Sequence, residues 1–169
     1  MNASNPKFRL IVGLGNPDSK YANTYHNVGH LFIDYLMTDP KLQTENSNLQ
    51  IYKSTVFMNL SGMFVKKMLK KSGAKPEQIL IVHDDSDIEI GKYKLSFGRG
   101  AAGHHGVENI QATIKTKKFW RLRIGIRPQP PYSLKLRRIK AEKFVLKKIT
   151  GADKKLLEKV FEKSTTEII

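Results

Sequence analysis

The chain has no cysteine, so neither disulfide bonds nor thiolate chemistry is available to it. No stretch approaches the eighteen or so consecutive apolar residues of a membrane-spanning helix, and the N-terminal MNASNPKFR lacks the apolar centre of a signal peptide. Acidic residues are scarce, with 15 Asp and Glu against 30 Lys and Arg. From these absences we expect a soluble protein with no membrane partner, placed in the cytoplasm or, as the alternative, in an organelle.

The excess of basic residues leaves a formal net charge of +15 on 169 residues. Such an excess favours a polyanionic partner, most simply nucleic acid, because neutralising phosphates releases condensed counterions. An acidic membrane surface is the rival partner. From residue 99 onward there are 18 basic and 6 acidic residues, a net +12, so this half of the chain carries most of the charge.

The length and the 40% hydrophobic content indicate one domain, residues 1–169, with a real core. Apolar runs and alternating patterns predict strands, and stripes at helical spacing predict helices of an α/β fold. We expect Ser61 to cap a helix that ends at Gly73, and residues 38–48 and 127–140 to be exposed loops. The predicted strands are residues 8–12, 51–57, 79–82, 92–97 and 121–126, and the predicted helices lie around residues 31–36, 64–71, 107–114 and 156–161.

Polar residues follow several of the apolar runs, where open α/β sheets place their ligands. They are Asn16, His26, Asn59, Asp84 and His105, from five separated places in the chain. A histidine beside a carboxylate and amides suits a hydrolase that activates water directly, because neutral imidazole is a base near neutral pH and amides can hold a carbonyl. No covalent nucleophile is evident.

Three other kinds of site compete with this interpretation. A metal site built from His83, Asp84, Asp85, Asp87 and His104 would indicate a metal-dependent nuclease. Residues 85–89 superficially resemble a calcium loop, but Ile90 stands where its glycine is required. The glycine pair in residues 13–15 is a weak dinucleotide motif, because Asp18 replaces the third glycine.

Six sequence blocks, taken in order, closely resemble the bacterial-type peptidyl-tRNA hydrolases over about residues 8–150. The blocks are residues 14–17 (LGNP), 25–29 (YHNVG), 57–62 (FMNLSG), 83–87 (HDDSD), 103–106 (GHHG) and 121–126 (RLRIGI). The resemblance implies a three-layer α/β/α sandwich with a mixed twisted sheet. It also implies a cofactor-free, metal-free monomer that cleaves the ester between a peptide and the 3′ end of its tRNA.

The same resemblance implies roles for individual residues. His26 matches the general base that takes a proton from water, and Asp84 matches the carboxylate that orients it. Asn16 resembles the residue that distinguishes a blocked from a free amino group, and Asn59 the amide that holds substrate near the ester. Tyr21 and Phe57 match positions that line the site, and Lys92 and Lys94 match lysines that meet tRNA phosphate.

One position departs from the family pattern. Its members usually read Gly-His-Asn-Gly where this chain has His105 in place of the asparagine. We expect His105 to lie in the substrate site beside His26, where a second titrating imidazole would make the acid limb of the rate profile steeper than one proton allows. Some relatives have become RNA-binding or splicing proteins with little hydrolase activity, and that is the alternative function.

Overall fold

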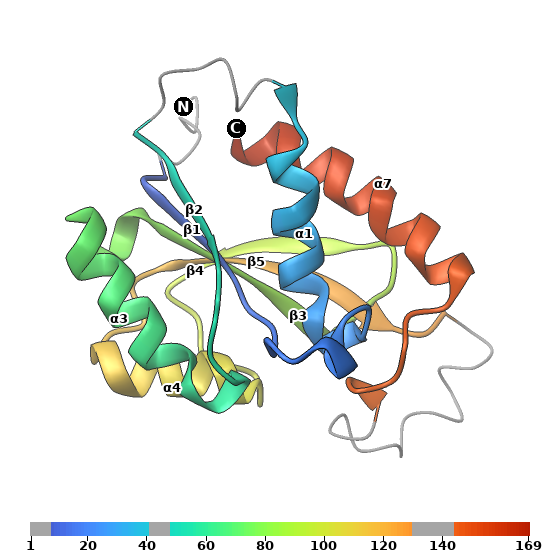
Figure 1. Ribbon diagram of the computed structural model, residues 1–169, viewed down its shortest axis with the longest axis horizontal. Coiled ribbons are helices and arrows are strands. Elements are labelled where there is room, and N and C mark those ends of the chain that lie inside the picture. The colour runs from blue at the N-terminus through green and yellow to red at the C-terminus, as the bar shows by residue number, and fades with distance from the viewer. Residues whose placement is uncertain (1–7, 41–47, 130–143) are drawn as a thin grey trace.

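The computed structural model describes residues 8–40, 48–129 and 144–169, which form one mixed sheet covered by helices (Figure 1). The strands are β1 (Leu10–Gly13), β2 (Gln50–Lys53), β3 (Ile79–Glu89), β4 (Tyr93–Phe97) and β5 (Trp120–Arg127). The α-helices are α1 (Val28–Met37), α3 (Ser61–Ser72), α4 (His105–Ile114) and α7 (Gly151–Ile168), and single turns of 3₁₀-helix are η1 (Ser19–Tyr21), η2 (Tyr25–Asn27), η3 (Met58–Leu60) and η4 (Pro76–Gln78).

The sheet has the strand order β2-β1-β3-β5-β4. The first four of these strands are parallel to their neighbours, and β4 pairs antiparallel with β5 at the edge. The expected mixed sheet is therefore confirmed. β1, β3 and β5 are the three interior strands. Their apolar runs are therefore buried on both faces, as their continuous hydrophobicity indicated.

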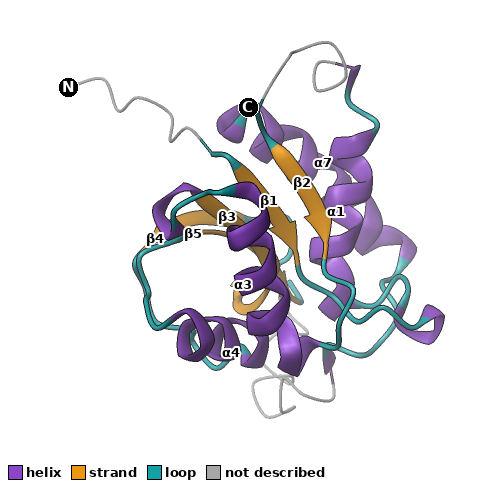
Figure 2. Cartoon of the chain, turned by 60° about the vertical axis from the view of Figure 1, so that its left-hand side comes forward, coloured by secondary structure: helices purple, strands orange, loops and turns teal. Residues whose placement is uncertain are grey.

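Helices cover both faces of the sheet, α1 and α7 on one side and α3 and α4 on the other (Figure 2). Side chains of β3 alternate between the two layers of core, since successive residues of a strand point to opposite faces. Leu80 and Val82 pack with α1 and α7, whereas Ile79 and Ile81 pack with α3 and α4. The three-layer α/β/α sandwich is thus confirmed.

Several element boundaries differ from the predictions. β3 continues through the polar residues 83–89 instead of ending at residue 82, because β5 extends alongside it with a register shift between Asp85 and Glu89. β2 ends at Lys53 rather than at residue 57. Ser61 does not cap α3: it is the first residue of that helix, and its hydroxyl donates to the Met58 carbonyl at 2.7 Å.

Gly73 ends α3 in the left-handed conformation at φ 63°, as predicted. Most of the basic loop expected at residues 127–140 lies outside the described residues. None of the described helices combines the length and the apolar composition that crossing a membrane requires.

Two glycines allow α1 to sit directly on the sheet. A Cβ at Gly29 would lie 2.5 Å from the carbonyl oxygens of Leu14 and Val82, and one at Gly13 would lie 2.3 Å from the Gly29 carbonyl. Neither contact is possible for a larger residue without a backbone shift. This close approach brings η2, which precedes α1, over the carboxyl end of β1 and against β3.

Candidate active site

Asp84 is the centre of the candidate site. It lies in β3 opposite Ile124 of β5, and its side chain is 3% exposed. The Nδ1 atom of His26, from η2, lies 2.9 and 3.0 Å from its two oxygens. The Nε2 atom of His104, which caps α4, lies 2.9 Å from Oδ1. Residues far apart in sequence therefore converge on one buried carboxylate.

The hydrogen bonds define which ring nitrogens carry protons. An ionised carboxylate only accepts, so His26 Nδ1 and His104 Nε2 must both donate to Asp84. The other nitrogen of His104 accepts from the Val107 N–H at 3.3 Å, so this ring is satisfied as a neutral imidazole. His26 Nε2 has no hydrogen-bond partner among the described residues, and the side chain is 14% exposed. With Nδ1 donating to Asp84, Nε2 is the ring nitrogen that can accept a proton.

Electrostatics around Asp84 favour its ionised form. Burial alone would raise the pKa of this carboxyl, but the attraction and hydrogen bonds of His26 and His104 outweigh burial and hold the pKa well below its usual range. Burial likewise lowers the pKa of His26, and the adjacent Asp84 carboxylate reverses this, so the pKa of His26 is raised above 6.5. The pair is thus arranged to hold a proton on imidazole next to an anion.

Asn16 is held in one orientation by its neighbours. Its backbone N–H donates to Oδ1 of Asn27 at 2.8 Å, and its carbonyl accepts from Nδ2 of Asn27 at 2.9 Å. Its own Oδ1 accepts from the Met58 N–H at 2.9 Å. With the side-chain oxygen occupied, the Nδ2 donors of Asn16 are what this amide can offer a ligand.

Two buried basic residues, His83 and Arg121, lie 3.5 Å apart, and His83 contacts the ring of His104. The ring of His83 packs edge-on against that of His104, with centroids 4.5 Å apart, and His83 Nδ1 donates to the Asp84 carbonyl at 2.7 Å. Arg121 is 1% exposed and donates to the Gly100 carbonyl at 2.7 Å. Burial, with the nearby His104 and Arg121, lowers the pKa of His83, so this ring is neutral.

The predicted substrate-binding side chains Tyr21, Phe57 and Asn59 lie in or beside the short 3₁₀-helices η1 and η3. The ring of Tyr21 meets that of Phe57 edge-to-face at 6.5 Å, and Phe57 is 47% exposed. Asn59 lies in η3, one residue after Met58, and is exposed. Phe57 and Asn59 flank Met58, whose backbone N–H donates to Asn16.

The predicted phosphate-binding lysines differ in their surroundings. Lys94 is exposed on β4, in register with Arg123 of β5, so the two side chains share one face of the sheet. Arg123 is also held by Asp85 at 2.7 Å. Lys92 precedes β4, and its ammonium lies 3.4 Å from Glu89. Lys94 is therefore the less neutralised of the two lysines.

The two neighbouring histidines, His104 and His105, differ in their surroundings. The side chain of His105 is 65% exposed and its Nδ1 atom lies 3.1 Å from Glu108 on the same helix. The imidazole beside His26 is that of His104, with ring centroids 5.2 Å apart. Because α4 begins at His105, consecutive side chains here point in different directions, and the place of His105 in the substrate site stays a prediction.

The alternative metal site of His83, Asp84, Asp85, Asp87 and His104 is not assembled. The Asp85 carboxylate is engaged by Arg123, and His83 points to a backbone carbonyl. Within residues 8–40, 48–129 and 144–169, the only group with metal-ligand geometry is His26, Asp84 and His104. Its ligand atoms already hydrogen-bond to one another.

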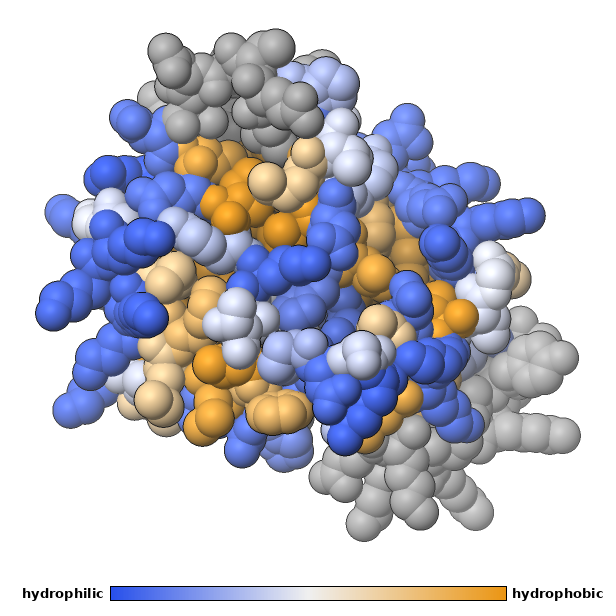
Figure 3. Space-filling model, in the orientation of Figure 1, coloured by the Kyte–Doolittle hydropathy of each residue, from blue (hydrophilic) through white to orange (hydrophobic). Residues whose placement is uncertain are grey.

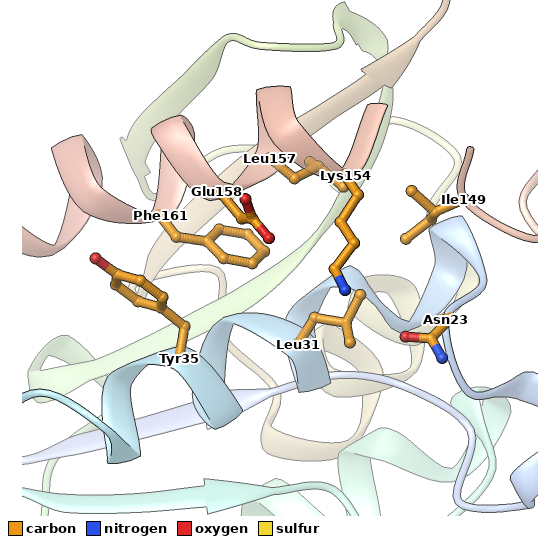
Figure 4. Close-up of a pocket in the computed structure, with 8 residues that line it drawn as sticks. All are labelled: Asn23, Leu31, Tyr35, Ile149, Lys154, Leu157, Glu158 and Phe161. Carbon is orange, nitrogen blue, oxygen red and sulfur yellow. The ribbon is translucent and has the colours of Figure 1, made fainter. Parts of the chain in front are cut away.

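Among the residues that the structure describes, Asp84 lines neither of two hollows. A polar hollow of about 330 Å³ is lined in part by Asn16, Asn27 and His30. An apolar hollow of about 400 Å³ lies between α1 and α7, with Leu31, Leu157 and Phe161 as its apolar wall (Figure 4). The contact between His26 and Asp84 therefore lies outside both hollows.

Sequence reasoning missed the role of Asn27, and it proposed His104 only as a ligand of the alternative metal site. Both stand in blocks that pointed to the site, residues 103–106 and 25–29, but each is adjacent to a residue that drew more attention. Their partners, Asp84 and Asn16, are distant or separated by a turn. A histidine placed to cap a helix after a glycine loop was the available signal.

Comparisons with known families, sequences and structures all find similarity to the same family. Residues 10–169 match the family model described as peptidyl-tRNA hydrolase. Peptidyl-tRNA hydrolase of Thermodesulfovibrio yellowstonii is 40% identical over 138 residues, 72% of this chain and 73% of that protein. That of Campylobacter curvus is 38% identical over 94% of this chain and 87% of its own. The crystal structure of peptidyl-tRNA hydrolase from Acinetobacter baumannii superposes with a TM-score of 0.81 at 30% identity, covering 99% of this chain and 89% of that one.

Proposed function

This chain belongs to the peptidyl-tRNA hydrolase family and hydrolyses the ester of peptidyl-tRNA, and we propose that His26 is the general base of the reaction. The observation that carries the proposal is the hydrogen bonding of His26 Nδ1 to both oxygens of Asp84 at 2.9 and 3.0 Å. This contact leaves Nε2 as the basic nitrogen, turned away from the carboxylate.

In this mechanism His26 Nε2 removes a proton from water as the oxygen attacks the ester carbonyl. The new carbon–oxygen bond gives a tetrahedral intermediate, and Asp84 stabilises the imidazolium that forms. His26 then returns the proton to the 3′ oxygen of the tRNA ribose as the ester bond breaks. The products are a peptide carboxylic acid and a free tRNA, and His26 is neutral again.

We propose that two amides position the substrate. Asn16 offers its Nδ2 donors, because its Oδ1 is occupied by Met58, and a substrate carbonyl near the blocked amino group is the matching acceptor. Asn59 is exposed nearby and suits a contact to the groups around the ester. Tyr21 and Phe57 supply an aromatic surface for the terminal nucleotide or the peptide.

The tRNA is proposed to reach the site across the basic edge of β4 and β5, with Lys94 and Lys92 on its phosphates. We propose that the enzyme acts as a monomer, since the contact between His26 and Asp84 forms within a single chain. Because the substrate is a product of translation, we propose that the enzyme acts in the cytoplasm.

The test is to offer N-blocked and free aminoacyl-tRNA to the protein and to its His26→Ala variant, and to measure released amino acid. We expect release from the blocked substrate alone, lost in the variant. Tight tRNA binding without release in the wild type would instead support an RNA-binding relative. Release abolished by a chelator would support metal-dependent chemistry.

A further inference from the structure

The helix α3 carries a concentrated positive charge that the proposed catalysis does not use. Its twelve residues include four lysines and no acidic residue. We call Lys66, Lys67, Lys70 and Lys71 the lysine face of α3. All four are exposed, while Phe64, Val65 and Met68 on the other side of the helix are buried. Figure 3 shows hydrophilic side chains projecting along the left-hand edge of the molecule, where Figure 1 places α3.

This charge is not neutralised within the described part of the protein. No ion pair joins any of the four lysines to the residues that the structure describes, and the one contact they make is that of Lys71 Nζ, 5.3 Å from the centre of the Tyr52 ring. Lys70 and Lys71 lie in the last turn, where cations stabilise the helix dipole. Lys66 and Lys67 lie a turn earlier and gain little from it.

The helix α7 provides an internal comparison. It also carries four lysines, but four acidic residues accompany them, so its formal charge is balanced. The exposed face of a helix can thus be hydrated by a balanced set of charges. Hydration alone therefore does not explain why α3 carries lysines and no acidic residue. The lysines of α7 are Lys154, Lys155, Lys159 and Lys163, and its acidic residues are Asp153, Glu158, Glu162 and Glu167.

The position of α3 relates its charge to the substrate. It begins directly after η3, whose Met58 N–H holds Asn16. At 1.5 Å per residue, Lys66 to Lys71 lie about 8 to 15 Å along the helix from its first residue. With the acceptor end of the tRNA in the proposed site, this separation would put the lysine face beside phosphates further along the RNA backbone.

We propose that the lysine face of α3 is a second phosphate-binding surface, which contacts the sugar–phosphate backbone of the substrate tRNA away from its acceptor end. The proposal rests on the proposed function, since it assumes the acceptor end in the site. RNA fits this surface better than a membrane does. Helices that insert into a membrane surface expose an apolar face, whereas Phe64, Val65 and Met68 of α3 are buried in the core and Met63 is the large apolar side chain of this helix that is mostly exposed.

The test compares two fourfold variants with the same net charge. The first is Lys66→Gln, Lys67→Gln, Lys70→Gln and Lys71→Gln, and the control is the same change at the four lysines of α7. Glutamine keeps helix propensity, and circular dichroism with thermal melting checks that both variants fold. The readouts are the Kd for deacylated tRNA over a salt series and the hydrolysis of two substrates. These are N-blocked aminoacyl-tRNA and the same blocked amino acid on a trinucleotide matching the tRNA 3′ end.

We expect the α3 variant to bind tRNA about 10- to 100-fold more weakly, with a salt slope reduced by about 2 to 4 units, and the α7 control to change little. KM for the full substrate should rise while the trinucleotide is cleaved at the wild-type rate. Equal tRNA affinity of the two variants would overturn the proposal. So would loss of binding to acidic phospholipid vesicles in the α3 variant with tRNA binding unchanged. A wild-type protein that cleaves neither substrate would instead refute the proposed function.

Discussion

His26 and His104 direct a ring nitrogen to the same oxygen of Asp84, and their ring centroids lie 5.2 Å apart. The carboxylate therefore serves two donors at once. A change at His104 therefore alters the charge and the hydrogen bonds around the carboxylate that His26 meets. The acid side of the rate profile, which follows His26, should report such a change.

The most direct prediction concerns the base itself. His26→Ala should lower kcat by about 100-fold or more, because general-base catalysis contributes this much, while the Kd for tRNA stays near the wild-type value. Asp84→Asn should be less severe, since the imidazole remains. Single-turnover hydrolysis of N-blocked aminoacyl-tRNA measures both. Near-normal turnover by His26→Ala would remove this residue from the chemistry.

The coupling of the two histidines predicts a pH shift. The reaction needs neutral His26, whose pKa is raised above 6.5, so the rate is highest above that pKa and falls as pH falls through it. His104→Ala removes a donor from Asp84, which leaves the carboxylate freer to stabilise the His26 imidazolium. The acid limb of kcat/KM should therefore move to higher pH.

His105→Asn is the matched control for this experiment. His105 is exposed and bonded to Glu108, so its replacement should leave the position and slope of the acid limb unchanged. An acid limb that moves in His105→Asn and not in His104→Ala would reverse our assignment of the two neighbouring histidines.

The layers of the fold were predictable from the sequence because buried parallel strands are apolar throughout. Residues 8–12 and 79–82 had this composition, and both proved to be interior strands. The continuation of β3 through residues 83–89 was not predictable locally. Polar residues are tolerated there only because Asp84 and Asp85 find partners from other elements, and such long-range partners leave no mark in a short window.

The candidate site was predictable as a set of residue types and only partly as geometry. Sequence reasoning identified His26 and Asp84, which the structure brings into contact. It could not choose between His104 and His105, because one step along the chain at the start of a helix turns a side chain by about 100°. The direction of each ring depends on where α4 begins, and that is decided by packing.

Phosphate binding should differ between the two predicted lysines. Lys94→Gln should reduce the salt slope of tRNA binding by about one unit, since one phosphate contact is lost. Lys92→Gln should have a smaller effect, because Glu89 at 3.4 Å already neutralises part of its charge. Fluorescence titration with deacylated tRNA over a salt series measures both slopes. A larger effect at Lys92 would show that this lysine leaves Glu89 for the RNA.

The last prediction concerns Asn27, which we assign as a positioning residue for Asn16. Asn27 is 4% exposed and uses both ends of its amide, accepting from the Asn16 N–H and donating to the Asn16 carbonyl. In Asn27→Asp the introduced carboxylate can still accept but cannot donate, and it faces a carbonyl oxygen. We expect a loss of about 1 to 3 kcal/mol in the free energy of unfolding at neutral pH, with kcat reduced and tRNA affinity kept.

This role carries a pH signature that simple loss of packing does not. When the introduced carboxyl is protonated it regains a donor, so the neutral form is the one that fits the folded protein and its pKa in the folded state is raised. The stability difference from wild type should therefore be largest at neutral pH and shrink as pH falls through that pKa. Urea unfolding of both proteins at several pH values measures it, with Asn27→Ala as the variant that has no titrating group. A difference that is the same at every pH would mean that the donated hydrogen bond to Asn16 contributes nothing.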